Sequence, residues 1–328
     1  MKIKINGKFY NHFNNLNIKF NLDSFASVFT FFAYFNKENK EIFKPLSYPT
    51  VEIFKDNELL LTGNLVSYSF SSSAEPQLVK VSGYSKAGIL EDVSIPFSFY
   101  PLEKNNKSLV EIANELLRAF KINLINSTNA ANLVYEKTIT DPSSTPASYI
   151  SKLASQRNII ISHNKKGDIV FKEININSKP KKIAAVTSSS FKADGRKFHS
   201  EVNVIRQPSD DNANSETFDK QSGLISNFRP ITKKMSSGED AETDKAASNL
   251  LAKELKSLQL TLNFSEIDYS LNNGDIINYK NEDLFIFRET KFIISSITYN
   301  EKKGSETMSL TCLLPESFTG KTPKNLFV

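Results

Sequence analysis

The densest group of carboxylates in the sequence lies at the start of one predicted helix. It consists of Glu239, Asp240, Glu242 and Asp244. A glycosidase needs two carboxyl groups that face each other across a cleft, so this group is the first candidate for catalysis. Acidic residues in the first turns of a helix, however, also stabilise the helix through its dipole. Because residues 239–258 form the predicted helix, we interpret the four acids as structural.

A second candidate is His199, which stands next to Ser200 and Glu201 in an order that suggests a hydrolase triad. The three residues belong to a predicted strand over residues 198–207. Successive side chains of a strand point to opposite faces of the sheet, so His199 and Ser200 cannot easily exchange a proton. We therefore expect His199 to be a surface residue of a strand.

Two further groups suggest binding. Asp194-Gly195-Arg196 has the form of a binding loop, although Asp-Gly is also a common turn signal. The other group is basic and comprises Lys121, Lys137, Lys165 and Lys166. Lysines near aromatic residues can bind single-stranded nucleic acid on an OB-like barrel. Aromatic residues in strands belong more often to the core, and we assign no nucleic acid to this group.

The remaining patterns are not typical of a catalytic, metal or cofactor site. Gly7, Gly63 and Gly83 form no phosphate-binding motif, and Asp210-Asp211 lacks the spacing of a calcium loop. The single cysteine excludes a disulfide framework and a Cys-based zinc site, and the three histidines lie far apart. We predict no catalytic residue, no cofactor and no metal, and hence a protein that is not an enzyme.

Length and composition are typical of a globular protein with two or three domains. The chain has 328 residues, of which 39% are hydrophobic and 25 are phenylalanine. Its net charge of +5 is spread without a basic block, so no specific nucleic-acid partner is expected. No apolar run approaches the length of a membrane span, and the alternating N-terminus predicts a strand where a signal peptide would be apolar. We expect a soluble protein made in the cytoplasm.

The predicted elements begin with a β domain and continue with an α/β unit. Short alternating or aromatic runs in residues 1–97 predict strands about ten residues apart, the spacing of a small barrel. Residues 98–178 switch to helical periodicity. Ser108 and Glu111 form a capping box for one helix, and Pro146 opens a second.

A second β domain is predicted over residues 179–316. It contains a long polar loop at residues 208–238, the helix at residues 239–258, and a closing series of strands. Residues 317–328 are predicted to form a tail. The fold class that follows is α+β, mainly β, with two similar small β-barrels bracketing an α/β unit.

The two β domains share an order of hairpins. Residues 51–61 and residues 277–287 are both predicted hairpins with an acidic or Asn-containing turn. Each is followed by a strand, a polar turn and a closing strand. Repeated hairpins alone can produce such a similarity in order, but the similarity also fits a duplicated module.

The first β domain ends in a distinctive run at residues 83–94, G-Y-S-K-A-G-I-L-E-D-V-S. We expect the preceding strand to stop at Gly83. We also expect a tight turn in which Gly88 takes a positive φ, an angle that glycine adopts at little cost. The run is therefore predicted to be a hinge between two packed units.

The chain resembles the baseplate hub proteins of Mu-type contractile-tailed phages, the late control protein D family. This group is related to the N-terminal half of the type VI secretion spike protein. The residues that carry the resemblance are the turn at 83–92, the helices at 109–120 and 147–156, Asp194-Gly195-Arg196, Phe228-Arg229-Pro230 and the run L-P-E-S-F at 314–318. The heavy use of Asn, Lys and Phe and the polar insert at residues 209–223 depart from the pattern.

The resemblance implies a structural hub of a phage-like contractile tail baseplate, a homotrimeric ring that joins the tail tube to a trimeric spike. It implies a location in the virion tail baseplate, after synthesis in the bacterial host cytoplasm. The implied partners are the spike, the tail tube and other baseplate proteins, with no membrane and no specific nucleic acid. Two alternatives stay open: a cell-wall hydrolase associated with a tail, and an OB-like nucleic-acid-binding barrel protein. The sequence identifies no interface residues, although residues 208–238 are a candidate contact surface.

Overall fold

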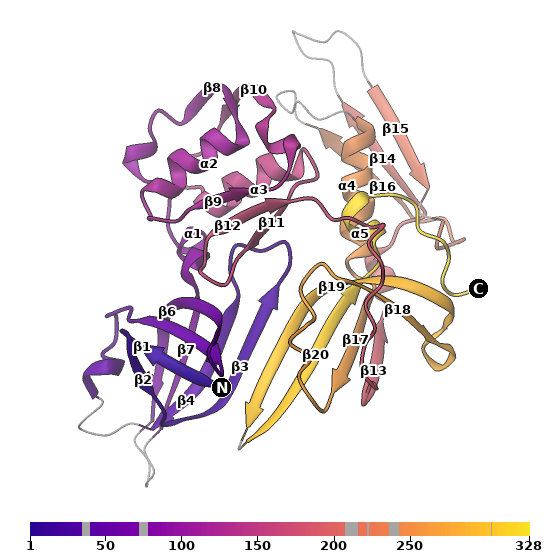
Figure 1. Ribbon diagram of the computed structural model, residues 1–328. Helices are drawn as coiled ribbons and strands as arrows, with labels where there is room; N and C mark the ends of the chain where they lie inside the picture. Colours follow the sequence, from indigo (N-terminus) through magenta and orange to yellow (C-terminus); the bar gives the residue numbers. More distant parts are fainter. Residues whose placement is uncertain (35–39, 72–77, 207–215, 222, 236–242, 303) are drawn as a thin grey trace. The chain divides into compact units, whose positions relative to one another are not determined.

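The computed structural model describes residues 1–34, 40–71, 78–206, 216–221, 223–235, 243–302 and 304–328. These residues divide into two compact units (Figure 1). Unit 1 comprises Met1–Glu173, Ser265–Asp268 and Ser296–Ser309. Unit 2 comprises Ile174–Phe264, Tyr269–Ser295 and Leu310–Val328.

Unit 1 begins with an antiparallel sheet whose strands bury alternate side chains. The strands are β1 (Lys2–Ile5), β2 (Lys8–Tyr10), β3 (Phe13–Asn21), β4 (Val28–Tyr34), β5 (Thr50–Lys55), β6 (Glu58–Phe70) and β7 (Leu78–Ser85). They pair in the order β2-β1-β5-β6-β7-β4-β3, and β3 also pairs with part of β19 (Ile286–Lys302). Phe29, Phe31 and Leu65 are among the fully buried residues of this core. The alternating pattern therefore specifies which face of each strand is buried.

The mainly β character of the chain is confirmed, with helices in the middle of the sequence and near its end. The strands of the described residues pair along an open path, and no pairing among them closes that path into a barrel. The first sheet is thus a large antiparallel sheet in which β2 ends the path on one side.

The middle of unit 1 is an α/β insert around its own core. Its elements are α1 (Ile89–Asp92), β8 (Glu103–Ser108), α2 (Leu109–Arg118), β9 (Leu124–Asn126), β10 (Val134–Ile139), α3 (Pro146–Ser155), β11 (Ile160–His163) and β12 (Ile169–Lys172). The predicted capping box is confirmed: Ser108 Oγ accepts a hydrogen bond from the Glu111 amide, and the Glu111 carboxylate accepts one from the Ser108 amide. Thr145 caps α3 and Pro146 opens it, as predicted.

Unit 2 contains a small sheet that the sequence did not predict in full. The elements of unit 2 are β13 (Ser188–Lys192), β14 (Glu201–Arg206), β15 (Glu216–Gln221), β16 (Pro230–Met235), α4 (Thr243–Leu255), β17 (Gln259–Phe264), β18 (Ile276–Asn281), the first part of β19, the end of β20 (Ser305–Leu313) and α5 (Glu316–Thr319). The small sheet consists of β14, β15 and β16. The predicted loop at residues 208–238 is wrong in part, because β15 and β16 fall within it and pair on either side of β14. Their polar composition and the proline at position 230 resemble loop sequence.

The C-terminal residues are packed against unit 2, so the prediction of a tail at residues 317–328 is wrong. Leu326 is 1% exposed, and the Phe327 ring meets Phe191 edge to face with centroids 6.0 Å apart. The Leu326 carbonyl accepts a hydrogen bond from the Phe287 amide at 3.4 Å. The apolar residues of this segment are few and show no periodicity, so the sequence did not indicate that it is packed.

The predicted repetition of hairpins is confirmed and extends to five strands. In the first module the neighbouring strands are β3-β4-β7-β6-β5, and in the second they are β13-β17-β20-β19-β18. Each module contains a hairpin followed by a closing strand, β5-β6-β7 in one and β18-β19-β20 in the other. The strands of the two modules therefore correspond one to one, both in their order along the chain and in their order of pairing. Similar turns alone would not require this correspondence.

The run at residues 83–94 differs from its prediction in physical detail. Strand β7 continues through Gly83 to Ser85, and a short 3-10 turn and α1 follow. Gly88 has a φ of −61°, so no left-handed conformation is needed there. A Cβ on Gly88 would lie 2.3 Å from the Tyr84 ring. Glycine is needed at this position because space is lacking.

The described helices include none that is long and apolar enough to cross a membrane.

Replacing Gly63 by alanine should destabilise unit 1 through backbone crowding. A Cβ at Gly63 would lie 2.0 Å from the Tyr84 carbonyl oxygen on the facing strand. We expect Gly63→Ala to lower the free energy of unfolding by about 1–3 kcal/mol, as overpacking does, in urea denaturation. The matched control is Gly195→Ala, whose Cβ would meet nothing within 4 Å. Equal stability of the two variants would contradict the crowding.

Candidate functional site

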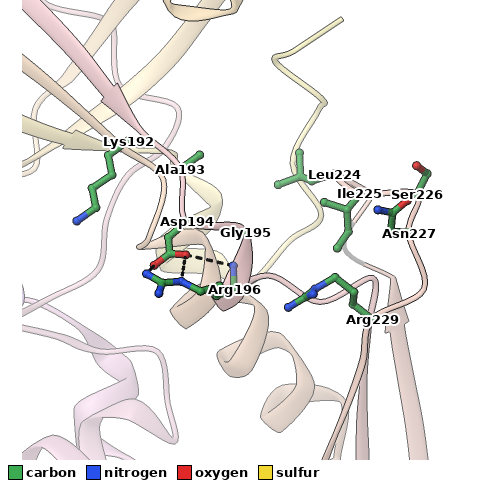
Figure 2. Close-up of a pocket in the computed structure, with 10 residues that line it drawn as sticks. All are labelled: Lys192, Ala193, Asp194, Gly195, Arg196, Leu224, Ile225, Ser226, Asn227 and Arg229. Atoms are coloured by element: carbon green, nitrogen blue, oxygen red, sulfur yellow. Dashed lines mark hydrogen bonds and ion pairs between the residues drawn. The ribbon is translucent and has the colours of Figure 1, made fainter.

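Unit 2 contains a cleft of about 890 Å³ between two short segments of chain. One wall is formed by residues 192–196, and the other by residues 224–229 (Figure 2). The predicted binding tripeptide Asp194-Gly195-Arg196 lies in the first wall. The structure therefore places this sequence candidate in a cavity.

Asp194 caps a 3-10 turn at Gly195–Lys197 and forms an ion pair with Arg196. The Asp194 carboxylate accepts hydrogen bonds from Arg196 Nε and Nη2, both at 2.9 Å, and from the Arg196 amide at 3.2 Å. The side-chain hydrogen bonds from Arg196 are the largest cause that lowers the pKa of Asp194, to about 2. Asp194 is consequently ionised and neutralised by its neighbour, which makes it a poor candidate for a general acid or base.

The cleft as a whole has basic and apolar walls. Lys192, Arg196 and Arg229 contribute positive charge, and Leu224 and Ile225 contribute apolar surface. Arg229 points into the cleft region in Figure 2 and donates from Nε to the Phe198 carbonyl at 3.2 Å. The ion-paired aspartate is the one carboxylate among these lining residues, so the cleft lacks the paired carboxylates of a glycosidase.

His199 is held by a helix and does not form a triad. Its Nδ1 lies 2.5 Å from Glu254 Oε1, and its amide donates to Glu254 Oε2 at 3.1 Å. Ser200 instead exchanges hydrogen bonds with Arg229, through its amide and its hydroxyl. His199 and Ser200 precede β14, and His199 is half-buried, so its prediction as a surface residue of a strand is wrong. The contact with Glu254 in α4 was missed. The two partners are 55 residues apart, and no local pattern connects them.

The four candidate lysines lie in different environments in unit 1. Lys137 forms an ion pair with Glu103 at 2.9 Å, and Lys165 forms one with Glu58. Lys121 and Lys166 line a second cavity of about 780 Å³. Two of the lysines are thus neutralised by carboxylates of the same chain, and a basic strip for a phosphate backbone is not formed by these four residues.

The cavity in unit 1 was not predicted from the sequence. Its lining residues are Tyr48, Thr50, Thr62, Gly63, Asn64, Tyr84, Lys86, Ile89, Asp92, Val93, Phe120, Lys121 and Lys166. Burial, and then the neighbouring Asp92 carboxylate, raise the pKa of Tyr84, so its hydroxyl remains protonated at neutral pH. The residues come from five separate stretches of chain, so no single sequence motif identifies the cavity.

The other candidates cannot be placed. Glu239, Asp240, Glu242 and the pair Asp210-Asp211 lie outside the described residues. The backbone of residue 244 lies in the first turn of α4. Within the described part of the chain, no group of three His, Cys, Asp or Glu side chains is arranged to hold a metal ion.

Comparison with solved structures gives matches along the whole chain. The 43 kDa tail protein of prophage MuSo2 from Shewanella oneidensis matches with a TM-score of 0.81 and 19% identity, over 96% of this chain and 98% of that one. The chain has the fold of a Mu-type phage tail protein. A tail protein from Neisseria meningitidis MC58 matches with a TM-score of 0.79 and 17% identity, over 98% of both chains.

The Mu-type tail-protein fold also matches a more distant structure. A component of the type VI secretion system from E. coli matches with a TM-score of 0.62 and 12% identity, over 99% of this chain and 80% of that one. No protein-family model and no curated sequence matches the chain. The predicted resemblance is thus confirmed by structure where sequence comparison finds nothing.

The ion pair in the unit 2 cleft can be tested by titration. We expect the carboxyl carbon of Asp194 to titrate at a pKa of about 2 in a ¹³C NMR experiment. In Arg196→Gln the pKa should rise toward the ordinary value of 3.8, because the guanidinium that favours the charged carboxylate is lost. Lys197→Gln is the control and should change the pKa much less. An unchanged Asp194 pKa in Arg196→Gln would exclude the ion pair in solution.

Proposed function

We propose that the protein is a structural hub of a phage-like contractile tail baseplate. In this proposal three copies form a ring that joins the tail tube to a central trimeric spike. The observation that carries the proposal is the match to Mu-type tail proteins over almost the full length of both chains. A similarity that covers every element is better support than a match to one β module, because small β modules occur in proteins of many functions.

The duplicated module supports the ring on grounds of symmetry. Each chain contains two five-stranded modules with the same strand order, so three chains present six related modules. A trimer built in this way can meet a threefold spike on one side and a sixfold tube on the other. Closed rings of identical chains use the same pair of surfaces at every junction.

The proposal includes the remaining features expected of such a hub. Its modules act as the two small barrel-like domains, at residues 1–97 and 179–316, on either side of the α/β insert at residues 98–178. Its partners are the spike, the tail tube and other baseplate proteins, and its location is the virion tail baseplate. Its role is structural and not enzymatic, which agrees with the ion-paired, non-catalytic arrangement of the unit 2 cleft.

The solution mass tests the proposal directly. We expect light scattering after size exclusion to give the mass of three chains of 36.9 kDa, about 111 kDa in total. Electron micrographs of that species should show a ring with threefold symmetry. A monomer that also fails to assemble when a trimeric spike protein is added would overturn the proposal.

A further inference from the structure

The hairpin between β18 and β19 carries an exposed aromatic tip. We use the term aromatic tip for Glu282, Asp283, Phe285 and Phe287. Phe285 is 65% exposed and Phe287 is 42% exposed, and their rings meet edge to face with centroids 6.0 Å apart. Glu282 and Asp283 are exposed beside them, and Glu282 forms an ion pair with Lys280 of the same hairpin at 2.9 Å. The tip therefore presents two large apolar side chains together with the carboxylate of Asp283.

The backbone of the aromatic tip is strained at Phe285. This residue has a φ of 58° and a ψ of 25°, the left-handed region that bulky side chains rarely adopt. The corresponding turn of the first module, between β5 and β6, also contains a positive φ, but there the residue is Asp56. Aspartate tolerates this region better than phenylalanine does. An exposed phenylalanine in a strained turn indicates a function for its side chain, since folding alone does not favour it.

The two hairpins also differ in what lies against them. In the first module, Glu58 follows the turn and forms an ion pair with Lys165 of the α/β insert. That hairpin end is thus engaged within unit 1. The equivalent position of the second module carries the aromatic tip. Exposed apolar side chains grouped in this way mark contact sites for another protein.

The cavity in unit 1 has the complementary chemistry, and we refer to it as the basic pocket. Tyr48, Ile89, Val93 and Phe120 supply apolar lining. The cationic lining residues are Lys86, Lys121 and Lys166. The carboxylate among the lining residues belongs to Asp92, which faces Tyr84. A volume of about 780 Å³ lies within the range of about 300–1,000 Å³ of ligand pockets, and is large enough to admit two phenylalanine side chains.

The rim of the basic pocket resembles the aromatic tip in its backbone. Leu46 and Tyr48 have φ values of 63° and 47°, and both are exposed, at 76% and 54%. The Tyr48 carbonyl is fixed by a hydrogen bond from Asn64 Nδ2 at 3.0 Å. A second segment with positive φ values and large exposed apolar side chains thus contributes Tyr48 to the pocket lining.

We propose that the aromatic tip of one copy of the chain inserts into the basic pocket of a second copy. Phe285 and Phe287 would fill the apolar part of the pocket, while Asp283 would face its lysines. Because tip and pocket are different surfaces, the contact is heterologous, and repeated use of it closes a ring when the rotation per copy permits. The proposal rests on the ring assigned under the proposed function and names the residues that join its copies.

Two variants that change exposed residues test the aromatic tip and the basic pocket independently. The tip variant is Phe285→Ser with Phe287→Ser, and the pocket variant is Ile89→Asp with Lys121→Glu. We expect each variant alone to be monomeric at concentrations where the unchanged chain is trimeric. The loss of a central apolar anchor should weaken association by at least about 30-fold. Phe228→Ser is the matched control, since Phe228 is another exposed phenylalanine of unit 2, at 78%, and it should leave the trimer intact.

Mixing the two variants gives the decisive measurement. The pocket variant retains a tip and the tip variant retains a pocket, so one junction can form but a ring cannot. We expect an equimolar mixture to contain a species of two chains of 36.9 kDa, about 74 kDa, in light scattering. A mixture that stays monomeric would overturn the proposed contact.

Charge reversal gives a second readout that does not remove apolar side chains. Asp283→Lys should weaken the trimer, and adding Lys121→Glu in the same chain should restore it. Trimers that survive both the tip and the pocket variant would overturn this contact while leaving the hub proposal intact. An unchanged chain that never forms trimers, with or without a spike protein, would overturn both.

Discussion

Crowding between the backbones of β6 and β7 is the constraint on which the arrangement of unit 1 depends. Side chains at Gly63 or Gly83 would collide with a carbonyl oxygen of the facing strand, at 2.0 and 2.1 Å. The close approach fixes Ser85 at the end of β7, where its hydroxyl accepts a hydrogen bond from the Ser27 amide at 3.0 Å. The Ser27 hydroxyl lies 2.8 Å from Nε2 of His163, whose pKa is lowered by burial. Ser27 and Ser85 thus connect the closely packed strands to His163 of the α/β insert.

The same constraint creates the cavity in unit 1. Tyr84 and Lys86 flank Ser85 in the chain, and both line the cavity. A side chain at position 88 would collide with the Tyr84 ring. Because Gly88 has none, α1 can lie close to β7, and Ile89 reaches the cavity wall. The run predicted to be a hinge therefore contains two positions, Gly83 and Gly88, where a side chain would collide with a neighbouring strand or ring. Its glycines serve close packing.

Local physics explains what the sequence could and could not predict. The capping box at Ser108 and the proline that opens α3 act over three or four residues, so both helices were predicted correctly. Strands β15 and β16 were not, because their pairing with β14 provides the stability that their composition lacks. The partnership of His199 with Glu254, and both cavities, combine residues distant in sequence. The tripeptide at residues 194–196 drew attention to one wall of the unit 2 cleft, and the other wall, residues 224–229, lies within the stretch 208–238 that was predicted as a contact surface. That the two walls face each other could not be predicted, because they are distant in sequence.

The two modules illustrate how a duplicated fold can acquire different surfaces. Both have the same strand order, and both place a left-handed residue at the tip of the corresponding hairpin. In the first module the residue with the positive φ is Asp56, and Glu58 of the same hairpin forms an ion pair with Lys165 of the α/β insert. In the second module the residue with the positive φ is Phe285, whose side chain stays 65% exposed and so contributes little hydrophobic stabilisation to the fold. The edge-to-face contact with Phe287 leaves the Phe285 ring largely exposed, so a strained backbone carries an exposed apolar side chain at this position. Strain and exposure together identify a binding surface better than composition does.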